Sequence, residues 1–177
     1  GVSLKERSNT LALICEAVLG RPVKIRSNTA LVGQKDFTGG SATDGRTIFL
    51  PDMVPSFNLM KLMTLHQAML LEHEQFLETS GKILFDPLSL HLDADRRMLR
   101  GLPNIRRDME QISSELPPTY PEKLAREFRG PLPWWGDILP QLRSDTDSTI
   151  RIIQDKAADY GDISPELVES LLTSMMA

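Results

Sequence analysis

The feature that most constrains the fold is a segment between Ser56 and Thr79 that has almost no polar face in its first two thirds. Apolar side chains fill this part of the segment, namely Leu59, Met60, Leu62, Met63, Leu65, Ala68, Met69, Leu70 and Leu71. A helix on a protein surface keeps its apolar residues on one stripe, whereas a helix that is apolar nearly all round is buried. We therefore predict a long helix over 56–79 at the centre of the fold, covered by the rest of the chain.

Local signals predict one helix and a small sheet before this central helix. Ser3 to Glu6 has the spacing of a capping box, and Gly20 is the residue type that ends helices, so a first helix is predicted over 4–19. Residues 22–26 alternate with period two, residues 30–33 follow, and a hairpin-type turn at 43–46 precedes residues 47–50. These segments predict two or three strands in a small sheet.

The chain after the central helix has the pattern of shorter helices, predicted over 89–100, 104–115, 121–129, 146–159 and 165–176. The order of helix, small sheet, buried helix and helical tail is typical of the α+β class. A length of 177 residues fits a single domain over 1–177. Within it we distinguish 1–51 with the first helix and sheet, 52–130 with the central helix and the helical region after it, and 131–177 with a Trp- and Pro-containing loop and the C-terminal helices.

Charge is distributed unevenly along the chain, which has a net charge of −4. Residues 1–46 hold seven Lys/Arg and four Asp/Glu, whereas residues 47–177 hold thirteen and twenty. Nucleic-acid binding usually requires basic residues clustered on one face. The basic residues of the first part are instead dispersed among predicted strands and turns, as Lys24, Arg26, Lys35 and Arg46 illustrate. We therefore expect no nucleic-acid partner.

The cysteine content and the hydropathy of the chain indicate the cellular compartment of the protein. The single cysteine, Cys15, excludes an internal disulfide framework and is predicted to be a buried, inert thiol. No apolar run approaches the roughly 20 residues that a membrane helix needs, so no membrane partner is expected. These features favour a cytoplasmic protein or a component of an intracellularly assembled particle. Because the sequence opens on Gly1 rather than Met, we expect a piece trimmed or excised from a longer polypeptide.

The central helix carries His66 where a zinc peptidase would place its metal. Such enzymes need H-E-x-x-H, in which two His on one helical face bind zinc and the Glu serves as general base. Here Gln67 stands at the position of the base and Leu70 at that of the second His. Gln cannot accept a proton from zinc-bound water at neutral pH. The alternative register, which starts at His73, also has Leu at the second ligand position, so neither register is complete.

Three segments together resemble the zincin-like amino-terminal domain of the cobaltochelatase T-subunit family, which the nitric-oxide-reductase activating proteins share. They are residues 42–51, which contain the family's T-D-G-x-x-I-x-L-P pattern, the helix around His66, and residues 104–110. Members of the group follow the first pattern with H-E-x-x-H and then with an N-x-x-E-D-x-R helix whose Glu is the third zinc ligand. The resemblance covers residues 1–130 and implies a zincin-like fold.

The resemblance also assigns roles to positions of this chain. The first zinc ligand falls on His66, the base on Gln67, the second ligand on Leu70 and the third on Arg107, beside a retained Asp108. Three of these four positions are lost, and the guanidinium at Arg107 would repel zinc. The resemblance therefore implies a degenerate site that holds no zinc and no other cofactor. For His66 we expect a packed core residue, with a polar contact to Asp108 or a metal ligand as the alternatives.

The main functional hypothesis is a non-catalytic, metallopeptidase-like domain that acts as a scaffold or protein-interaction module, as a structural component of a larger assembly. Adjacent indoles at Trp134 and Trp135 are candidate partner contacts, with a clamp over the core as the alternative. The resemblance implies an AAA+ ATPase partner and a von Willebrand A-type domain, which would lie beyond Ala177. Two other functions stay open. One is a metal-dependent peptidase or hydrolase that uses His66, His73 and a distant carboxylate, and the other is a cobaltochelatase-type subunit fragment that works with the ATPase.

Overall fold

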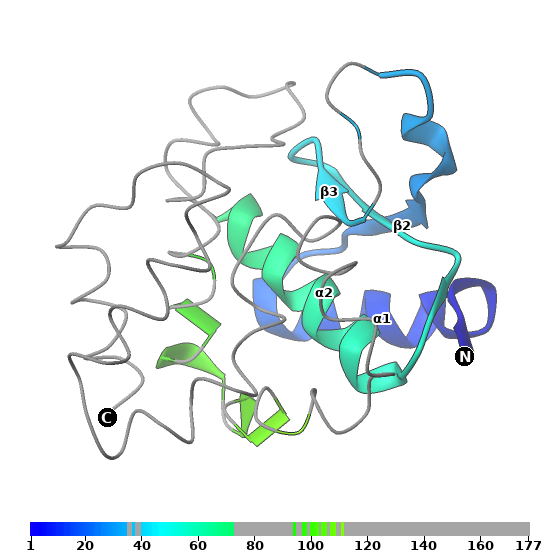
Figure 1. Ribbon diagram of the computed structural model, residues 1–177. Helices are drawn as coiled ribbons and strands as arrows, with labels where there is room; N and C mark the ends of the chain where they lie inside the picture. The colour runs from blue at the N-terminus through cyan, green and yellow to red at the C-terminus, as the bar shows by residue number, and fades with distance from the viewer. Residues whose placement is uncertain are drawn as a thin grey trace, which may run out of the picture.

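The computed structural model describes residues 1–34, 37, 40–72, 94, 97–98, 100–102, 104–105, 107–108 and 111. This part of the chain is an α+β structure that combines two α-helices with two small sheets (Figure 1). The helices predicted over 121–129, 146–159 and 165–176 lie outside the described residues, as do His73, Trp134 and Trp135.

The first helix, α1, spans Leu4–Leu19 and confirms the prediction for 4–19. Gly20 ends it in the left-handed region at φ 71°, where its N–H donates to the Glu16 carbonyl at 2.8 Å. The predicted capping box is wrong, because the Ser3 side chain makes no capping hydrogen bond. Val2–Ser3 is instead a short strand, β1, which pairs antiparallel with β5 at Met53–Val54.

The main sheet has three strands in the order β2-β4-β3. The central strand β4 (Thr47–Leu50) runs parallel to β2 (Lys24–Ser27) and antiparallel to β3 (Ala42–Thr43), which confirms a small sheet and the turn at 43–46. The strand predicted at 30–33 is wrong, because Asn28–Leu31 forms a 3-10 helix, η1. Ser27 Oγ accepts a hydrogen bond from the Thr29 N–H at 3.2 Å, and such local bonds of Ser favour turns over strands.

The central helix, α2, spans Phe57–Leu71. It begins where predicted, since Ser56 Oγ accepts a hydrogen bond from the Leu59 N–H at 3.1 Å and caps the helix. Every residue from Leu62 to Leu71 is buried, which confirms that this helix forms the core. The helix ends at Leu71, where exposed Glu72 follows at φ −90° and ψ 0°, and residues 73–79 of the predicted helix lie outside the described residues.

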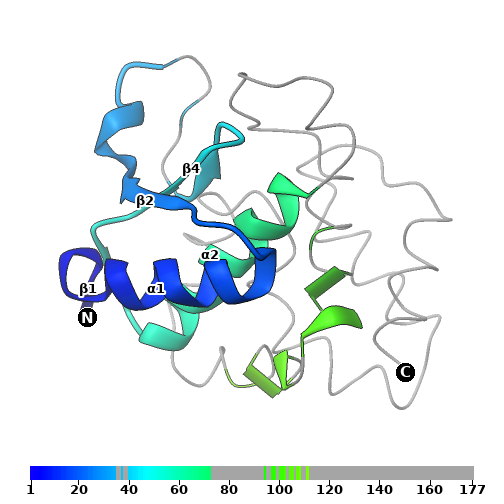
Figure 2. The same cartoon turned by 180° about the vertical axis from the view of Figure 1, so that it is seen from behind.

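The helices and the sheet form two layers. Both α1 and α2 lie on the same side of the three-stranded sheet, and α1 contacts β2 whereas α2 contacts β4 and β3 (Figures 1 and 2). Ile48 and Leu50 share one face of β4 and are both 0% exposed. Phe49 lies on the opposite face, in a cluster with Leu31, Ala42 and half-buried Phe37. Both faces of the central strand are therefore covered.

Helical turns also occur in the described residues between 94 and 111, and they overlap the helices predicted over 89–100 and 104–115. The Leu102 N–H donates to the Met98 carbonyl at 3.0 Å, and the Asp108 N–H donates to the Asn104 carbonyl at 3.2 Å. Met98 and Ile105 are buried. These turns lie beside α2 (Figure 1). Within the described residues, no helix is both long and apolar enough to cross a membrane.

Cys15 is 0% exposed on α1, and this burial raises the pKa of its thiol to about 11 from an ordinary value of 9.0. Because the thiolate is the nucleophile, we expect alkylation of the native protein at pH 8 to be at least about tenfold slower than alkylation of the unfolded chain. Mass spectrometry after timed iodoacetamide treatment, with and without urea, measures both rates. Equal rates would contradict an inert thiol. Burial penalises the thiolate in the folded state, so Cys15 leaves the stability unchanged below about pH 9, and the free energy of unfolding falls as the pH rises from 9 toward 11.

Candidate functional site

The side chains of Thr43 and Asp44 stabilise the turn before β4 through hydrogen bonds within the turn. Asp44 Oδ1 accepts hydrogen bonds from the Arg46 N–H at 2.9 Å and the Thr47 N–H at 2.8 Å. Thr43 Oγ1 donates to the Thr47 carbonyl at 2.8 Å and accepts from the Gly45 N–H at 3.2 Å. Gly45 adopts φ 93°, a left-handed conformation that favours glycine. The conformation of the turn explains each of these residues, so the turn's role in this part of the chain is to position β4.

Gln67, the position of the base in the related pattern, ties α2 to the sheet. Its Nε2 donates to Ser41 Oγ, directly before β3, at 3.0 Å. Gln67 is 0% exposed, and its Oε1 is buried with no hydrogen-bond partner. A buried acceptor without a partner costs about 1–3 kcal/mol. This amide therefore stands in packed core, where it makes one structural hydrogen bond.

The two potential ligand positions on α2 are also in the core. His66 is 0% exposed and Leu70 is 1% exposed. The two residues are four apart, so they share one face of the helix. The apolar side chain of Leu70 fills the volume where the pattern requires an imidazole. The prediction that His66 is a buried residue of the central helix is confirmed.

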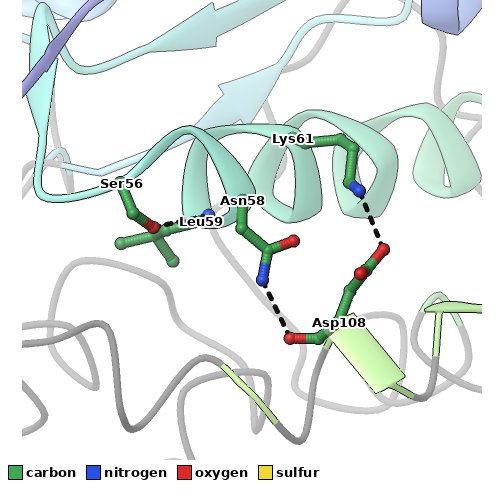
Figure 3. Close-up of polar contacts among 5 residues, drawn as sticks. All are labelled: Ser56, Asn58, Leu59, Lys61 and Asp108. Atoms are coloured by element: carbon green, nitrogen blue, oxygen red, sulfur yellow. Dashed lines mark hydrogen bonds and ion pairs between the residues drawn. The ribbon is translucent and has the colours of Figure 1, made fainter.

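Asp108 is the point where the later helical turns attach to α2. Its carboxylate Oδ2 accepts from Lys61 Nζ at 2.8 Å, and its backbone carbonyl accepts from Asn58 Nδ2 at 3.0 Å (Figure 3). The expected alternative of a polar contact between Asp108 and His66 stays a prediction, because the bonds of Asp108 to Lys61 and Asn58 do not test it.

Polar side chains fix α2 on two opposite sides. Asn58 and Gln67 are nine residues apart, which corresponds to two and a half helical turns and therefore to opposite faces. Asn58 and Lys61 hold the turn at Asp108, while Gln67 holds Ser41 beside the sheet. Arg107, next to Asp108, is exposed. Its guanidinium does not share the fully buried surroundings of His66 and Leu70.

The residues at these positions do not fit the zinc that the resemblance would place there. They offer one imidazole, one amide already bonded to Ser41, one apolar side chain and one exposed cation. Zinc sites in proteins use three or four Cys, His or carboxylate ligands. In the described ranges no three His, Cys, Asp or Glu side chains gather in a way that could hold a metal.

The ion pair between Lys61 and Asp108 is partly buried, with 26% and 24% of the two side chains exposed. We expect a double-mutant cycle with Lys61→Met and Asp108→Asn to give a coupling free energy of about 1 kcal/mol, measured by urea unfolding. Asp108→Asn keeps the backbone carbonyl that Asn58 binds. The pair Arg21 and Glu72, at 3.6 Å with 44% and 48% of the side chains exposed, is the control and should couple weakly. Equal coupling in both cycles would contradict a specific anchor.

Sequence reasoning did not single out Ser41, Asn58 or Lys61. Each is a polar residue whose partner lies far along the chain, from 26 residues for Ser41 and Gln67 to 50 for Asn58 and Asp108. One local signal was available, since Asn58 and Lys61 are polar residues in the first turns of a mostly apolar helix. Comparisons with protein-family models, curated proteins and solved structures find no match to this chain.

Proposed function

We propose that this chain is a non-catalytic, metallopeptidase-like domain of zincin-like fold that acts as a scaffold or protein-interaction module within a larger assembly. The expected partner class is the AAA+ ATPases, which the resemblance to the cobaltochelatase T-subunit family implies. The proposed location is the cytoplasm or an intracellularly assembled particle.

The observation that carries this proposal is that buried core side chains stand at the positions where a zinc site would lie. Gln67 and Leu70 are 0% and 1% exposed, and the Gln67 amide bonds to Ser41. A catalytic zinc site keeps an open coordination position for water or substrate. Buried side chains stand at the base and second ligand positions of α2, and this supports a structural role for the helix.

A rigid centre also suits a module that presents surfaces to partners. α2 is joined to the sheet through Gln67 and to the turn at Asp108 through Lys61 and Asn58. These contacts fix elements that are distant in the sequence relative to one another. Preorganised surfaces bind with a smaller loss of conformational entropy, which favours an interaction role for such a fold.

Metal analysis of the purified 177-residue chain tests the proposal directly. We expect substoichiometric zinc by mass spectrometry, and a urea midpoint that does not change after treatment with a chelator. The alternative is a metal-dependent hydrolase with a non-standard ligand set. Stoichiometric zinc whose removal lowers the urea midpoint would overturn the non-catalytic proposal in favour of that alternative, since a metal bound only to the native state stabilises it.

The partner proposal has its own test, because a domain can lack metal and still lack partners. We expect an AAA+ ATPase to co-purify in stoichiometric amount with the chain expressed at its native level in its native source. Purification of the chain without any stoichiometric protein would contradict an interaction role.

A further inference from the structure

Within the described residues, the outer edge of β2 has no strand paired to it. β2 forms the edge of its sheet there and bonds to β4 on its inner side. Among the described residues, no backbone hydrogen bond outside the sheet involves Lys24, Ile25 or Arg26. Figure 2 shows β2 at the margin of the sheet, above α1. An edge strand presents unpaired N–H and C=O groups, which are a template for an added strand.

The side chains along this edge are cationic. Lys24 and Arg26 are exposed and project to the same face of the strand, because they are two residues apart. Within the described part of the chain, neither of these two cations forms an ion pair. We call Lys24 and Arg26 the basic edge.

The basic edge is a local exception on an acidic chain, whose net charge is −4. Cations on an edge strand also prevent the edges of two copies from pairing, because like charges then face each other. The same charges would favour an added strand that carries carboxylates, since opposite charges on neighbouring strands stabilise pairing. The same cations therefore repel a second copy of the chain and attract an acidic segment.

The chemistry of the basic edge favours a peptide over a nucleic acid. Two cations are few for a nucleic-acid site, whose affinity depends on many phosphate contacts. Open strand N–H and C=O groups, in contrast, match the backbone of an extended peptide. The basic edge also lies away from the Gln67 region, since β2 contacts α1 whereas β4 and β3 contact α2.

We propose that the edge of β2 docks an extended, acidic peptide segment of a partner protein, which adds to the sheet as a further strand. Backbone hydrogen bonds to β2 provide the pairing, and alternate Asp or Glu side chains of the segment face Lys24 and Arg26. This inference rests on the proposed interaction role and gives that role a surface and a partner chemistry.

A fluorescently labelled, capped octapeptide of alternating Glu and Val is the probe, and its anisotropy is titrated with the 177-residue chain. We expect saturable binding that weakens as salt rises, because exposed charges are screened. The same peptide with Lys for Glu should not bind, and an N-methylated Glu-Val peptide should lose most of its affinity. Equal binding of the N-methylated peptide would overturn strand addition, and tighter binding of a single-stranded oligonucleotide would overturn the peptide as the occupant.

Charge variants locate the site. Lys24→Glu with Arg26→Glu should weaken peptide binding at least about tenfold, as reversal of two interfacial charges replaces attraction with repulsion. The matched control is Lys5→Glu with Arg100→Glu, which makes the same change of net charge at two other exposed positions and should change affinity less than about twofold. If the variant with Lys24→Glu and Arg26→Glu does not fold, Lys24→Gln with Arg26→Gln replaces it. This neutral variant should lose less affinity for the peptide than the charge-reversed one. Equal effects at the two pairs of positions would overturn the proposal.

Capture of the native partner separates this inference from the proposed function. If the edge variant still captures the partner that co-purifies with the parent chain, the basic edge is not the docking site and the interaction role stands. If the parent chain captures no partner and holds stoichiometric zinc, the proposed function itself fails. Loss of capture in the edge variant alone supports both.

Discussion

Gln67→Glu is expected to destabilise the protein strongly at neutral pH. Gln67 is 0% exposed, and its amide contacts Ser41 Oγ at 3.0 Å. A carboxylate of the same shape would be a charge in packed core with one hydroxyl as its partner, and burial raises the pKa of such a group by about 3–5 units. The carboxyl group would therefore take up a proton in the folded state while it is ionised in the unfolded state.

The free-energy cost of taking up this proton determines how much stability the variant loses. At pH 7, protonation of a carboxyl group with an unfolded pKa of about 4.3 costs about 3–4 kcal/mol, since one pKa unit corresponds to about 1.4 kcal/mol. The folded pKa lies above the unfolded one, so the penalty is absent below about pH 4 and grows as the pH rises. Urea unfolding of the variant and the parent at several pH values between 4.5 and 8 measures the difference in the free energy of unfolding.

Gln67→Met is the matched control, because it keeps the length of the side chain and has no ionisable group. Its difference from the parent should not depend on pH. The Gln67→Glu variant also restores the Glu of the peptidase pattern, so added zinc is a second test. If zinc returned the stability of this variant to that of the parent, the conclusion that the residues around His66 do not fit a metal would be overturned.

Leu70→Ala is expected to lower the free energy of unfolding by about 2–5 kcal/mol. Leu70 is 1% exposed in a helix that is buried from Leu62 to Leu71, so the truncation removes packing contacts and leaves a cavity. In an open metal cleft, the same residue would line solvent and its truncation would cost little. Denaturant unfolding with an unchanged slope gives the difference in stability.

Leu13→Ala makes the same chemical change on α1, where Leu13 is 67% exposed. This control should change stability by no more than about 0.5 kcal/mol, as is usual for surface substitutions. A Leu70→Ala effect as small as that of Leu13→Ala would show that the position is not part of the core, and it would remove the observation on which the non-catalytic proposal depends.

Elements with strong local signals could be predicted from the sequence. The bounds of α1 follow from its periodicity and from Gly20, which adopts the left-handed conformation that ends the helix. The turn before β4 follows from Asp44-Gly45, where the side-chain bonds of Asp44 and the positive φ of Gly45 are both local. In each case the conformation is determined by residues within a few positions of one another.

Elements that depend on distant partners could not be predicted. β1 exists because Val2–Ser3 pairs with Met53–Val54, and Ser3 therefore does not form the capping box that its local spacing favours. The parallel pairing of β2 with β4 likewise joins segments separated by η1 and β3. Local patterns contain no information about which distant backbone groups meet, so tertiary pairing overrides local preference here.

The features of the candidate site also fall into those that local sequence determines and those that depend on distant partners. The sequence by itself determined that α2 is buried, because apolar residues all round a helix cannot be left in water, and that Gln67, Leu70 and Arg107 depart from a zinc-binding pattern. Only the tertiary structure decided that Gln67 bonds to Ser41, that Asp108 bonds to Lys61, and that Lys24 and Arg26 lie on an edge strand of the sheet. The physical reason is that burial depends on composition along one helix, whereas the partner of a polar group depends on which distant segments packing brings within about 3 Å.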